Sequence, residues 1–243
     1  ALTYGTNEDL QTMDLTSDVK EVHKALAKEG FSVDDFEINE KNTKELLLHK
    51  TDVFFNLSYG VGSIPNSESE VPKLLEKTKI PYTGSSAKAM ILTTDKAKTK
   101  ELLYKNHIPT PNFQVVKTEI FNLTKTLSFP LITKPQNEDS SCGIQQSSVV
   151  NNIIDLRKQV KKILKTYKEP VLIEKYIDGR ELRISVLGNG KRARVLPMTE
   201  IFFKRTYRNK WHIVDFSAKW DHDADKDTPA AQAKLDKKLY MII

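Results

Sequence analysis

Residues 131–143 read LITKPQNEDSSCG, a short apolar strand followed by a polar loop. The strand ends at Lys134, and the loop holds two serines and a glycine. A helix is predicted next, because apolar residues recur at helical spacing between 153 and 167, and the apolar run 171–175 predicts another strand. The order strand, loop, helix, strand predicts a mixed α and β layer. A lysine that precedes a loop of exposed backbone N–H groups favours an anionic ligand.

Beyond residue 175 the pattern indicates antiparallel β-structure. Apolar and polar residues alternate over 182–187, a turn follows at Gly188-Asn189-Gly190, and apolar residues return at 195–196. Alternation on both sides of a glycine-containing turn predicts a hairpin. Residues 227–243 are expected to contain only a loop and a helix.

Upstream of the opening stretch lies a linker. Residues 108–111 read IPTP, and two prolines so close together are incompatible with a helix. The linker therefore separates a lysine-rich helix, predicted over about 95–106, from a strand predicted over 113–116.

The first ninety residues predict alternating strands and helices. Strands are expected at 2–4, 33–38 and 52–57, and alternation of this kind is typical of a parallel sheet with crossover helices. Three pairs of residues have the spacing of helix capping boxes or starts: Asp18 with Glu21, Asn42 with Glu45, and Ser67 with Glu70. Ligands of open α/β sheets bind beyond the carboxyl ends of the strands, so we expect a site near Gly5 and the loop 58–62.

The composition favours a globular protein that binds a small anion. The 243 residues are 39% hydrophobic and 29% charged, and no apolar run is long enough to span a bilayer. The start of the chain has no signal-peptide pattern, which favours a cytoplasmic location. One cysteine, Cys142, permits no intramolecular disulfide, and its pattern offers no nucleophile or zinc site. The formal net charge is +6, but acids are interspersed with the lysines and arginines, which disfavours nucleic-acid binding.

Three lysines stand at element ends, where phosphate groups are commonly bound. Lys96 begins a predicted helix, Lys134 ends a strand, and Lys175 ends the next strand. A helix start already attracts anions through its backbone N–H groups. Each lysine alone is typical of a surface residue, whereas the order and context of the three favour phosphate binding.

Several motifs follow one another along the chain: FNLSYG at 55–60, IPYTGS at 80–85, TDK at 94–96, ITKP at 132–135, EDSSCG at 138–143, LIEKYIDGRE at 172–181 and LPMTEI at 196–201. Their order and spacing resemble the D-alanine–D-alanine ligase family of the ATP-grasp superfamily. The resemblance covers nearly the whole chain. It implies an α/β fold, α+β in its ATP-grasp part. The implied domains are an N-terminal parallel α/β subdomain over 1–91 and an ATP-grasp domain over 92–243, with its nucleotide-binding part at about 108–177 and the start of its C-terminal part at 178–243.

The resemblance also implies roles for individual residues. Lys96 and Lys134 would bind ATP phosphates, the backbone of 174–177 would recognise adenine, and Glu181 would accept hydrogen bonds from the ribose. The backbone N–H groups of the loop 138–143 would cover the phosphates, and Ser140 would position an amino acid. The predicted catalytic residues are Glu8, Ser140 and Lys219. The predicted nucleotide-binding residues are Lys96, Lys134, Ser140, Ser141, Glu174, Lys175, Tyr176, Ile177, Glu181 and Lys219.

The chain departs from the family pattern at several positions. Asp139 stands where the family usually has Gly, Cys142 where it has an aliphatic residue, and Ser58 where it tends to have His. Trp220 replaces a Tyr, and an indole N–H can donate a hydrogen bond but not accept one. The acid that holds the amine of the first substrate is either Glu8 or Asp9, and this alternative stays open.

The function that the resemblance implies is an ATP-dependent carboxylate–amine ligase that joins two amino acids, such as D-alanine, through an acyl phosphate. Its cofactors would be ATP and Mg²⁺, with the metal ligands expected beyond Ile243, so we expect the chain to be incomplete and a poor catalyst as it stands. Two alternatives stay open: an ATP-grasp nucleotide-binding module without turnover, and a ligase for another amino or hydroxy acid. The family implies a cytoplasmic peptidoglycan precursor role without nucleic-acid or membrane partners, and leaves a homodimer open.

Overall fold

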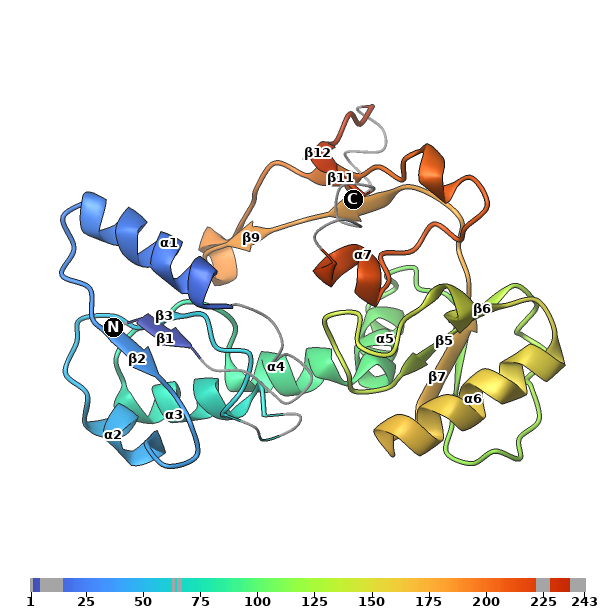
Figure 1. The fold of residues 1–243 in the computed structure, drawn as a ribbon, viewed down its shortest axis with the longest axis horizontal. Helices are drawn as coiled ribbons and strands as arrows, with labels where there is room; N and C mark the ends of the chain where they lie inside the picture. The colour runs from blue at the N-terminus through green and yellow to red at the C-terminus, as the bar shows by residue number, and fades with distance from the viewer. Residues whose placement is uncertain (1, 5–14, 63, 65–66, 222–227, 237–243) are drawn as a thin grey trace. The chain divides into compact units, whose positions relative to one another are not determined.

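The computed structural model describes residues 2–4, 15–62, 64, 67–221 and 228–236 (Figure 1). The chain divides into two compact units, each described here by itself. The first contains Ala1–Thr110 with Gln136–Asp139, and the second contains Pro111–Pro135 with Ser140–Ile243. Compact units reflect packing, whereas the boundary predicted between residues 91 and 92 follows a family pattern. That boundary stays a prediction.

The first unit is built on a parallel sheet with strand order β2-β1-β3. The strands are β1 (Leu2–Tyr4), β2 (Asp35–Glu37) and β3 (Phe55–Asn56). Thr3 of β1 pairs with Phe36 on one side and with Asn56 on the other. Helix α1 (Leu15–Lys28) leads from β1 to β2, and α2 (Thr43–Leu48) leads from β2 to β3. The predicted parallel sheet with crossover helices is therefore confirmed in this part.

Three further helices complete the first unit: α3 (Glu70–Thr78), α4 (Ala87–Thr94) and α5 (Lys96–Lys105). Its core is a cluster of apolar side chains from the strands and helices, namely Ile38, Leu46, Phe54, Val61, Val71 and Leu75. Asp95 alone separates α4 from α5, and its side chain accepts a hydrogen bond from the backbone N–H of Lys98 at 3.1 Å. The predicted helix start at Lys96 is confirmed.

Of the three predicted helix starts in the first unit, the one at Asn42 is confirmed. The capping boxes predicted at Asp18 and Ser67 are wrong. Helix α1 begins at Leu15, so Asp18 lies inside its first turn. Helix α3 begins after Ser69, and Ser67 Oγ instead accepts from Val61 N at 2.9 Å and donates to Ile64 O at 2.6 Å. Asn42 directly precedes α2, as predicted, although its side chain makes no cap hydrogen bond and its amide donates to Glu37 O at 2.7 Å. The side chain of Ser67 closes the preceding loop and is therefore not used as a cap.

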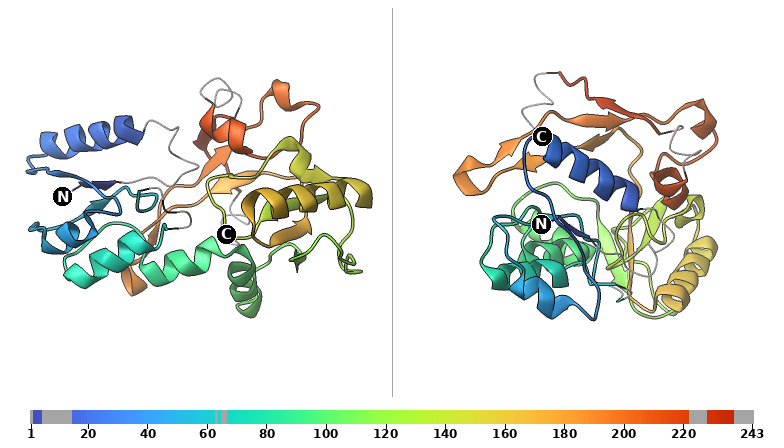
Figure 2. Two further views of the ribbon diagram at one scale, coloured as in Figure 1. Left: turned by 60° about the horizontal axis from the view of Figure 1, so that its bottom comes forward. Right: turned by 60° about the vertical axis from the view of Figure 1, so that its left-hand side comes forward.

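The second unit contains an antiparallel sheet with strand order β4-β7-β5-β6. Its strands are β4 (Phe113–Val116), β5 (Leu131–Pro135), β6 (Val149–Val150) and β7 (Val171–Lys175). Helix α6 (Ile153–Tyr167), capped by the side chain of Asn152, lies across one face of this sheet (Figures 1 and 2). Leu156, Val160 and Ile163 of α6 pack with Leu131 and Val171 in the core.

A second, smaller sheet follows, with strand order β12-β11-β8. Its strands are β8 (Glu181–Arg183), β11 (Thr199–Ile201) and β12 (Ala230–Gln232), and the hairpin β9 (Val186–Leu187) with β10 (Arg194–Val195) extends from it. The hairpin is confirmed, but the single strand predicted over 182–187 is two strands with different partners, because β8 pairs with β11 and β9 with β10. Residues 230–232 form a strand on the edge of β11 and not the predicted loop or helix.

The last described helix is α7 (Phe216–Trp220), which begins after Asp215. Single 3-10 turns occur at Gln146–Ser148, Gly190–Arg192 and Arg205–Tyr207. Within the ranges that the structure describes, every helix is too short or too polar to cross a membrane.

The packing of α6 on the sheet predicts the effect of one core substitution. Leu156 is 0% exposed, so Leu156→Ala should lower the free energy of unfolding by about 2–5 kcal/mol through lost burial and the cavity left behind. Ile154, on the same helix, is 77% exposed, and Ile154→Ala should change the free energy by less than about 0.5 kcal/mol. Urea unfolding followed by circular dichroism measures both, and equal effects would contradict this packing.

Candidate functional site

Strands β5 and β7 pair in the centre of the larger sheet, so their side chains alternate between its two faces. Leu131, Val171 and Ile173 pack in the core cluster with α6. The alternate residues, Ile132, Lys134, Leu172 and Glu174, therefore belong to the opposite face. We call this set the lysine face. It combines two buried aliphatic side chains with one cation and one acid.

Lys134 and Glu174 form an ion pair on the lysine face, with Lys134 Nζ donating to Glu174 Oε1. The two residues are diagonal neighbours, since Lys134 pairs in register with Leu172 and Glu174 with Ile132. Their side chains are 28% and 9% exposed, respectively. A carboxylate this buried is costly without a partner, so the lysine is needed where it stands. The pair fixes the position of the ammonium group at the end of β5.

Glu181, the first residue of β8, lies within electrostatic reach of the same lysine. Burial raises the pKa of Glu181 above its ordinary value, while Arg183 and then Lys134 act in the opposite direction. Lys134 therefore acts on two carboxyl groups, from β7 and β8. The sequence prediction grouped these three residues only by family pattern, and the structure brings them together.

The segment that follows Glu174 is held by its backbone and by one aromatic side chain. Tyr176 is buried, and its ring meets Trp211 edge to face with 5.1 Å between ring centroids. Its hydroxyl donates to His212 O at 3.3 Å and accepts from His212 N at 3.1 Å. Ile177, the next residue, is 62% exposed. The stretch is thus fixed at Tyr176 and presents an apolar side chain at Ile177.

Lys175 points away from the lysine face. Its ammonium group donates to the carbonyl oxygens of Ser128 and Phe129 at 3.1 and 3.0 Å. Its backbone N–H donates to Asn112 O at 3.1 Å. The side chain of Lys175 is therefore not grouped with Lys134, and a contribution to nucleotide binding would come from its backbone.

Residues 140–148, which we call the serine loop, have an unusual backbone. Ser140, Ser141 and Gly143 all have positive φ angles, of 51°, 65° and 75°. A Cβ at Gly143 would lie 2.6 Å from Pro135 Cγ, so only glycine fits there. Successive residues in the left-handed region are disfavoured for serine and persist only where the surroundings hold them.

Contacts from residues 211–220 hold the serine loop. Trp220 Nε1 donates to Ser140 O at 2.8 Å, Ser141 Oγ donates to Val214 O at 2.9 Å, and Phe216 N donates to Ile144 O at 3.0 Å. Lys219 is exposed, and its ammonium lies 5.2 Å from the centre of the Trp220 ring. The structure thus brings together Ser140, Ser141 and the helix that carries Lys219.

In the first unit, Lys96 contacts the segment that follows β5. Its ammonium donates to Glu138 O, and its backbone N–H donates to Gln136 O at 3.1 Å. Gln136 Nε2 also donates to Asp95 Oδ1 at 2.9 Å. The start of α5 therefore fixes residues 136–138, which immediately precede the serine loop in the chain.

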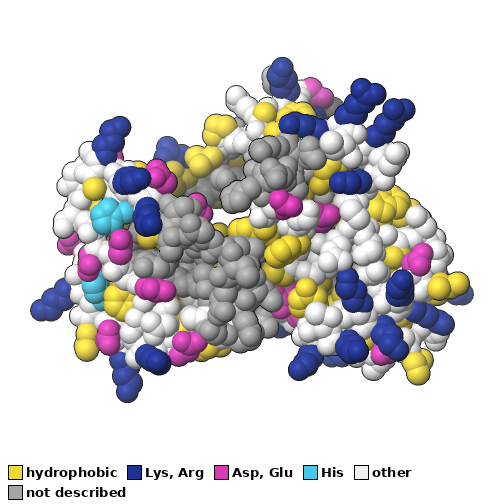
Figure 3. Space-filling view, in the orientation of Figure 1, with side chains coloured by type: hydrophobic (Ala, Val, Ile, Leu, Met, Phe, Trp, Pro, Cys, Tyr) yellow, Lys and Arg dark blue, Asp and Glu magenta, His cyan; other side chains and the backbone are white. Residues whose placement is uncertain are grey.

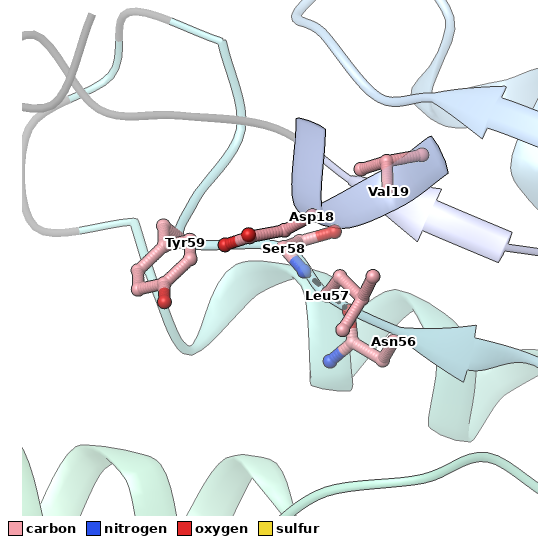
Figure 4. A pocket seen from close by; sticks show the side chains of 6 residues that line it. All are labelled: Asp18, Val19, Asn56, Leu57, Ser58 and Tyr59. Carbon is pink, nitrogen blue, oxygen red and sulfur yellow. Dashed lines mark hydrogen bonds between the residues drawn. The ribbon is translucent and has the colours of Figure 1, made fainter. Parts of the chain in front are cut away.

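A pocket of about 250 Å³ lies in the first unit and is lined by Asp18, Val19, Asn56, Leu57, Ser58 and Tyr59 (Figure 4). It follows β3, at the carboxyl end where the sequence predicts a ligand. Asn56 Oδ1 accepts from Ser58 N at 3.1 Å, and Asp18 extends toward Tyr59 (Figure 4). Burial raises the pKa of Tyr59, and Asp18 and Asp139 raise it further. Gly5, Glu8 and Asp9 lie outside the described residues.

The family model described as "D-ala D-ala ligase C-terminus" matches residues 102–243, which is more than half of the chain. The chain belongs to the D-alanine–D-alanine ligase family. The family predicted from the motifs is therefore confirmed.

Two relatives and one solved structure illustrate the similarity. Protein y4sG of Sinorhizobium fredii (strain NBRC 101917 / NGR234) is 38% identical over 63% of this chain and 44% of its own length. The D-alanine–D-alanine ligase of Bordetella pertussis (strain Tohama I / ATCC BAA-589 / NCTC 13251) is 34% identical over 75% of this chain and 56% of its own length. The chain thus spans about half the length of these relatives.

The structure of the Bacillus anthracis D-alanine–D-alanine ligase complexed with ATP superposes with a TM-score of 0.70 and 21% identity. The match covers 99% of this chain and 72% of that one. Identity this low supports the fold alone. The predicted fold class, parallel α/β followed by an α+β part, is confirmed.

Sequence reasoning missed three residues that shape the site: Gln146, Trp211 and Asp215. Asp215 Oδ1 caps α7 by accepting from Ala218 N at 2.9 Å, and Gln146 contacts both Trp211 and Asp215. An Asp directly before Phe216 and Ala218 is a helix-start signal that could have revealed the cap. No comparable signal identifies Gln146, because its partners lie 65 and 69 residues away.

The grouping of Lys134 with Glu181 predicts a coupled titration. Since Lys134 lowers the pKa of Glu181, Lys134→Met should raise that pKa further above its ordinary value. Carbon-13 NMR of the glutamate carboxyl groups measures the titration. Lys165→Met removes an exposed lysine on α6 and should leave the pKa of Glu181 unchanged. An unchanged pKa in Lys134→Met would show that the two groups are not close.

The raised pKa also predicts the pH dependence of stability. The folded protein binds the Glu181 proton more tightly than the unfolded chain, so the contribution of this group falls as pH rises from the unfolded to the folded pKa. Glu181→Gln should remove this decline. Urea midpoints measured at intervals between about pH 4 and pH 7 compare the two proteins, and identical profiles would contradict the assignment.

Proposed function

We propose that the protein of this chain is an ATP-dependent ligase that activates an amino-acid carboxylate as an acyl phosphate, which the amine of a second amino acid attacks. The family membership supports this proposal. The observation that carries it is the convergence of Lys134, Glu174 and Glu181 at the lysine face. This arrangement fits a nucleotide. It places a fixed cation beside aliphatic side chains, together with a carboxyl group that can accept hydrogen bonds from sugar hydroxyls.

The residues at the lysine face suit ATP part by part. Ile132 and Leu172 are apolar, and the exposed Ile177 follows the segment predicted to recognise adenine. Glu181, when ionised, is an acceptor for two ribose hydroxyls. Lys134 would contact phosphate oxygens as a point charge whose position the ion pair with Glu174 fixes. The solved B. anthracis ligase holds ATP, which supports nucleotide binding by the shared fold.

The proposed reaction consists of two displacements. A carboxylate oxygen of the first amino acid attacks the γ-phosphorus of ATP, and ADP leaves, which gives an acyl phosphate. The uncharged amine of the second amino acid then attacks the acyl carbon, inorganic phosphate leaves, and a proton is lost from the nitrogen. Both steps develop charge on oxygen, so lysines and backbone N–H groups stabilise them. Ser140, Ser141 and Lys219 would serve here, and the roles of Lys96 and Glu8 stay predictions.

Magnesium ions accompany ATP in enzymes of this kind, where they neutralise phosphate charge. Among the residues that the structure describes, no group of three or more His, Cys, Asp or Glu side chains could hold a metal ion. The described residues thus offer no all-protein metal cluster, and we derive no step through Mg²⁺.

The pocket beside Ser58 is a candidate site for the first amino acid. Within the described residues, Ser58 Oγ is buried and has no hydrogen-bond partner, so it could receive a bond from a ligand. Asp18 offers a carboxylate for an ammonium group at the same pocket. These features suit an amino acid, and D-alanine is the first to test.

We further infer a cytoplasmic role in peptidoglycan precursor synthesis without nucleic-acid or membrane partners, and leave a homodimer open. On the face shown in Figure 3, Lys and Arg side chains are dispersed among Asp and Glu and do not form one basic stripe. Such a distribution suits a small anionic ligand better than a polynucleotide.

A second candidate function is a nucleotide-binding module without turnover. The observation that favours it is Trp220, which donates to the backbone carbonyl of Ser140, whereas the family has a Tyr hydroxyl at this position. An indole cannot accept a proton or a hydrogen bond in the substrate network. This module would bind ATP but release no ADP.

Lys134→Met should weaken ATP binding by about 30- to 150-fold, which corresponds to about 2–3 kcal/mol for a contact between a charged group and phosphate. Because Glu174 is nearly buried and loses its ion pair with Lys134, the single variant should also lose about 1–3 kcal/mol of stability. The double variant Lys134→Met/Glu174→Gln should recover stability but not affinity. Isothermal titration calorimetry and urea unfolding separate the two effects. Lys165→Met is the control, and parent-like ATP affinity in the double variant would reject the site.

Coupled measurement of ADP release tests turnover. The whole protein, supplied with ATP, Mg²⁺ and pairs of D-amino acids, should release ADP with at least one pair, D-alanine with itself being the first. ATP binding without ADP release from any amino-acid or hydroxy-acid pair would support the module and contradict the ligase.

A further inference from the structure

One side chain joins the serine loop to the segment before α7. Gln146 Nε2 donates to Asp215 Oδ2 at 3.1 Å and to Trp211 O at 3.3 Å. Gln146 Oε1 accepts from Trp211 N at 2.8 Å. Both ends of the amide are thus used, and they contact two points four residues apart on the partner segment. Within the described residues, Gln146 thus joins the serine loop to both Trp211 and Asp215.

The partner carboxylate also fixes a helix. Asp215 is 7% exposed, and its other oxygen, Oδ1, accepts from Ala218 N in the first turn of α7. A buried carboxylate that is hydrogen-bonded on both oxygens has one position and one rotamer. Gln146 therefore contacts the residue that sets where α7 begins and how it is oriented.

Helix α7 carries two residues of the candidate site. Lys219 and Trp220 lie in its last turn, and Trp220 Nε1 returns to the serine loop at Ser140 O. The loop and the helix are therefore joined at both ends, by Gln146 at one end and by Trp220 at the other. Between them lie the bonds of Ser141 to Val214 and of Phe216 to Ile144.

We propose that Gln146 is a positioning residue, which holds the serine loop against α7 and thereby places Ser140 and Lys219 for phosphoryl transfer. This inference rests on the proposed ligase function for its catalytic consequence. The hydrogen bonds of Gln146 go to Trp211 and Asp215 and not to the lysine face. Its loss should therefore alter loop placement and weaken nucleotide binding far less than the loss of Lys134 does. The strained backbone at Ser140 and Ser141 depends on such external support.

The chain contains its own reporter of this contact. Cys142 is the one cysteine of the sequence, lies near the start of the serine loop and is 5% exposed. A thiol reagent reaches it only when the loop opens or the protein unfolds. The rate of labelling under native conditions therefore measures how often the loop leaves its partner segment.

Gln145 provides a matched control. It is the neighbouring residue of the same type, is exposed, and its side-chain oxygen accepts from Lys162 Nζ at 2.8 Å on α6 and not from residues 211–215. Gln145→Leu should change the labelling rate of Cys142 by less than about twofold, whereas Gln146→Leu should raise it by about tenfold or more. If Gln146→Leu does not fold, Gln146→Asn takes its place in the experiment. It retains the amide group with a shorter reach and should likewise raise the labelling rate by about tenfold or more.

The result is compared with global stability from urea unfolding of the same variants. Faster labelling that exceeds the change in the global unfolding equilibrium supports the proposal. Equal labelling of the Gln145 and Gln146 variants overturns it, and so does a rise in labelling fully accounted for by global unfolding. This test needs no turnover, so it stands whether or not the protein is a ligase.

Kinetics test the catalytic consequence. In the whole protein, Gln146→Leu should lower kcat for ADP release by about tenfold or more while the Kd for ATP stays within about threefold of the parent. An unchanged kcat, or a loss of ATP affinity as large as that of Lys134→Met, overturns the positioning role. A parent protein that releases no ADP contradicts the proposed function, and the labelling of Cys142 then decides the loop contact by itself.

Discussion

The ion pair between Lys134 and Glu174 joins the two central strands of the larger sheet on the face opposite α6. Because side chains alternate along a strand, one face of β5 and β7 packs its apolar side chains against α6, and the side chains of the other face do not contact that helix. Those side chains can therefore bind a ligand. Glu174 is nearly buried, so its charge is stabilised by the cation beside it. The pair therefore fixes a cation where the strand ends and the serine loop begins.

Two features of the second unit depend on this arrangement. The lysine lies within reach of Glu181, so the first strand of the smaller sheet is electrostatically coupled to the larger one. The strand that carries Lys134 continues through 136–138 into a loop whose backbone conformation is held by residues 211–220. Rigid strands thus supply the charge, and loops that pack on each other supply the polar groups around it. Such a division is common in binding sites, because loops vary while the scaffold positions them.

Much of the fold could be predicted from the sequence, because it depends on local pattern. A clear hydrophobic pattern, bounded by turn residues, marks the strands 113–116, 131–135 and 171–175 and the helix 153–167. Predictions were wrong where the same local sequence pattern can serve a second structural role. Ser67 resembles a cap yet closes a loop, and residues 182–187 alternate regularly yet divide between two partners. Pairing partners such as β11 and β12 are set by tertiary contacts, which a period-2 pattern does not specify.

The candidate site also divides into residues that local patterns identify and residues whose role depends on tertiary contacts. Lys134, Glu174 and Glu181 could be named because they stand in ordered motifs, although only the structure shows that one cation acts on both acids. Lys175 belongs to the same motif, but alternation along β7 turns its side chain to Ser128 and Phe129. Gln146 could not be named, because a glutamine in a polar loop is ordinary until its distant partners are known. Residues whose role depends on contacts distant in sequence are those that sequence reasoning misses.

The central claim is that nucleotide binds at the lysine face. A crystal structure of the protein with a non-hydrolysable ATP analogue tests it most directly. We expect a phosphate oxygen within about 3 Å of Lys134 Nζ and the ribose hydroxyls hydrogen-bonded to the Glu181 carboxylate. An analogue bound elsewhere, with Lys134 and Glu181 making no contact to it, would contradict the account.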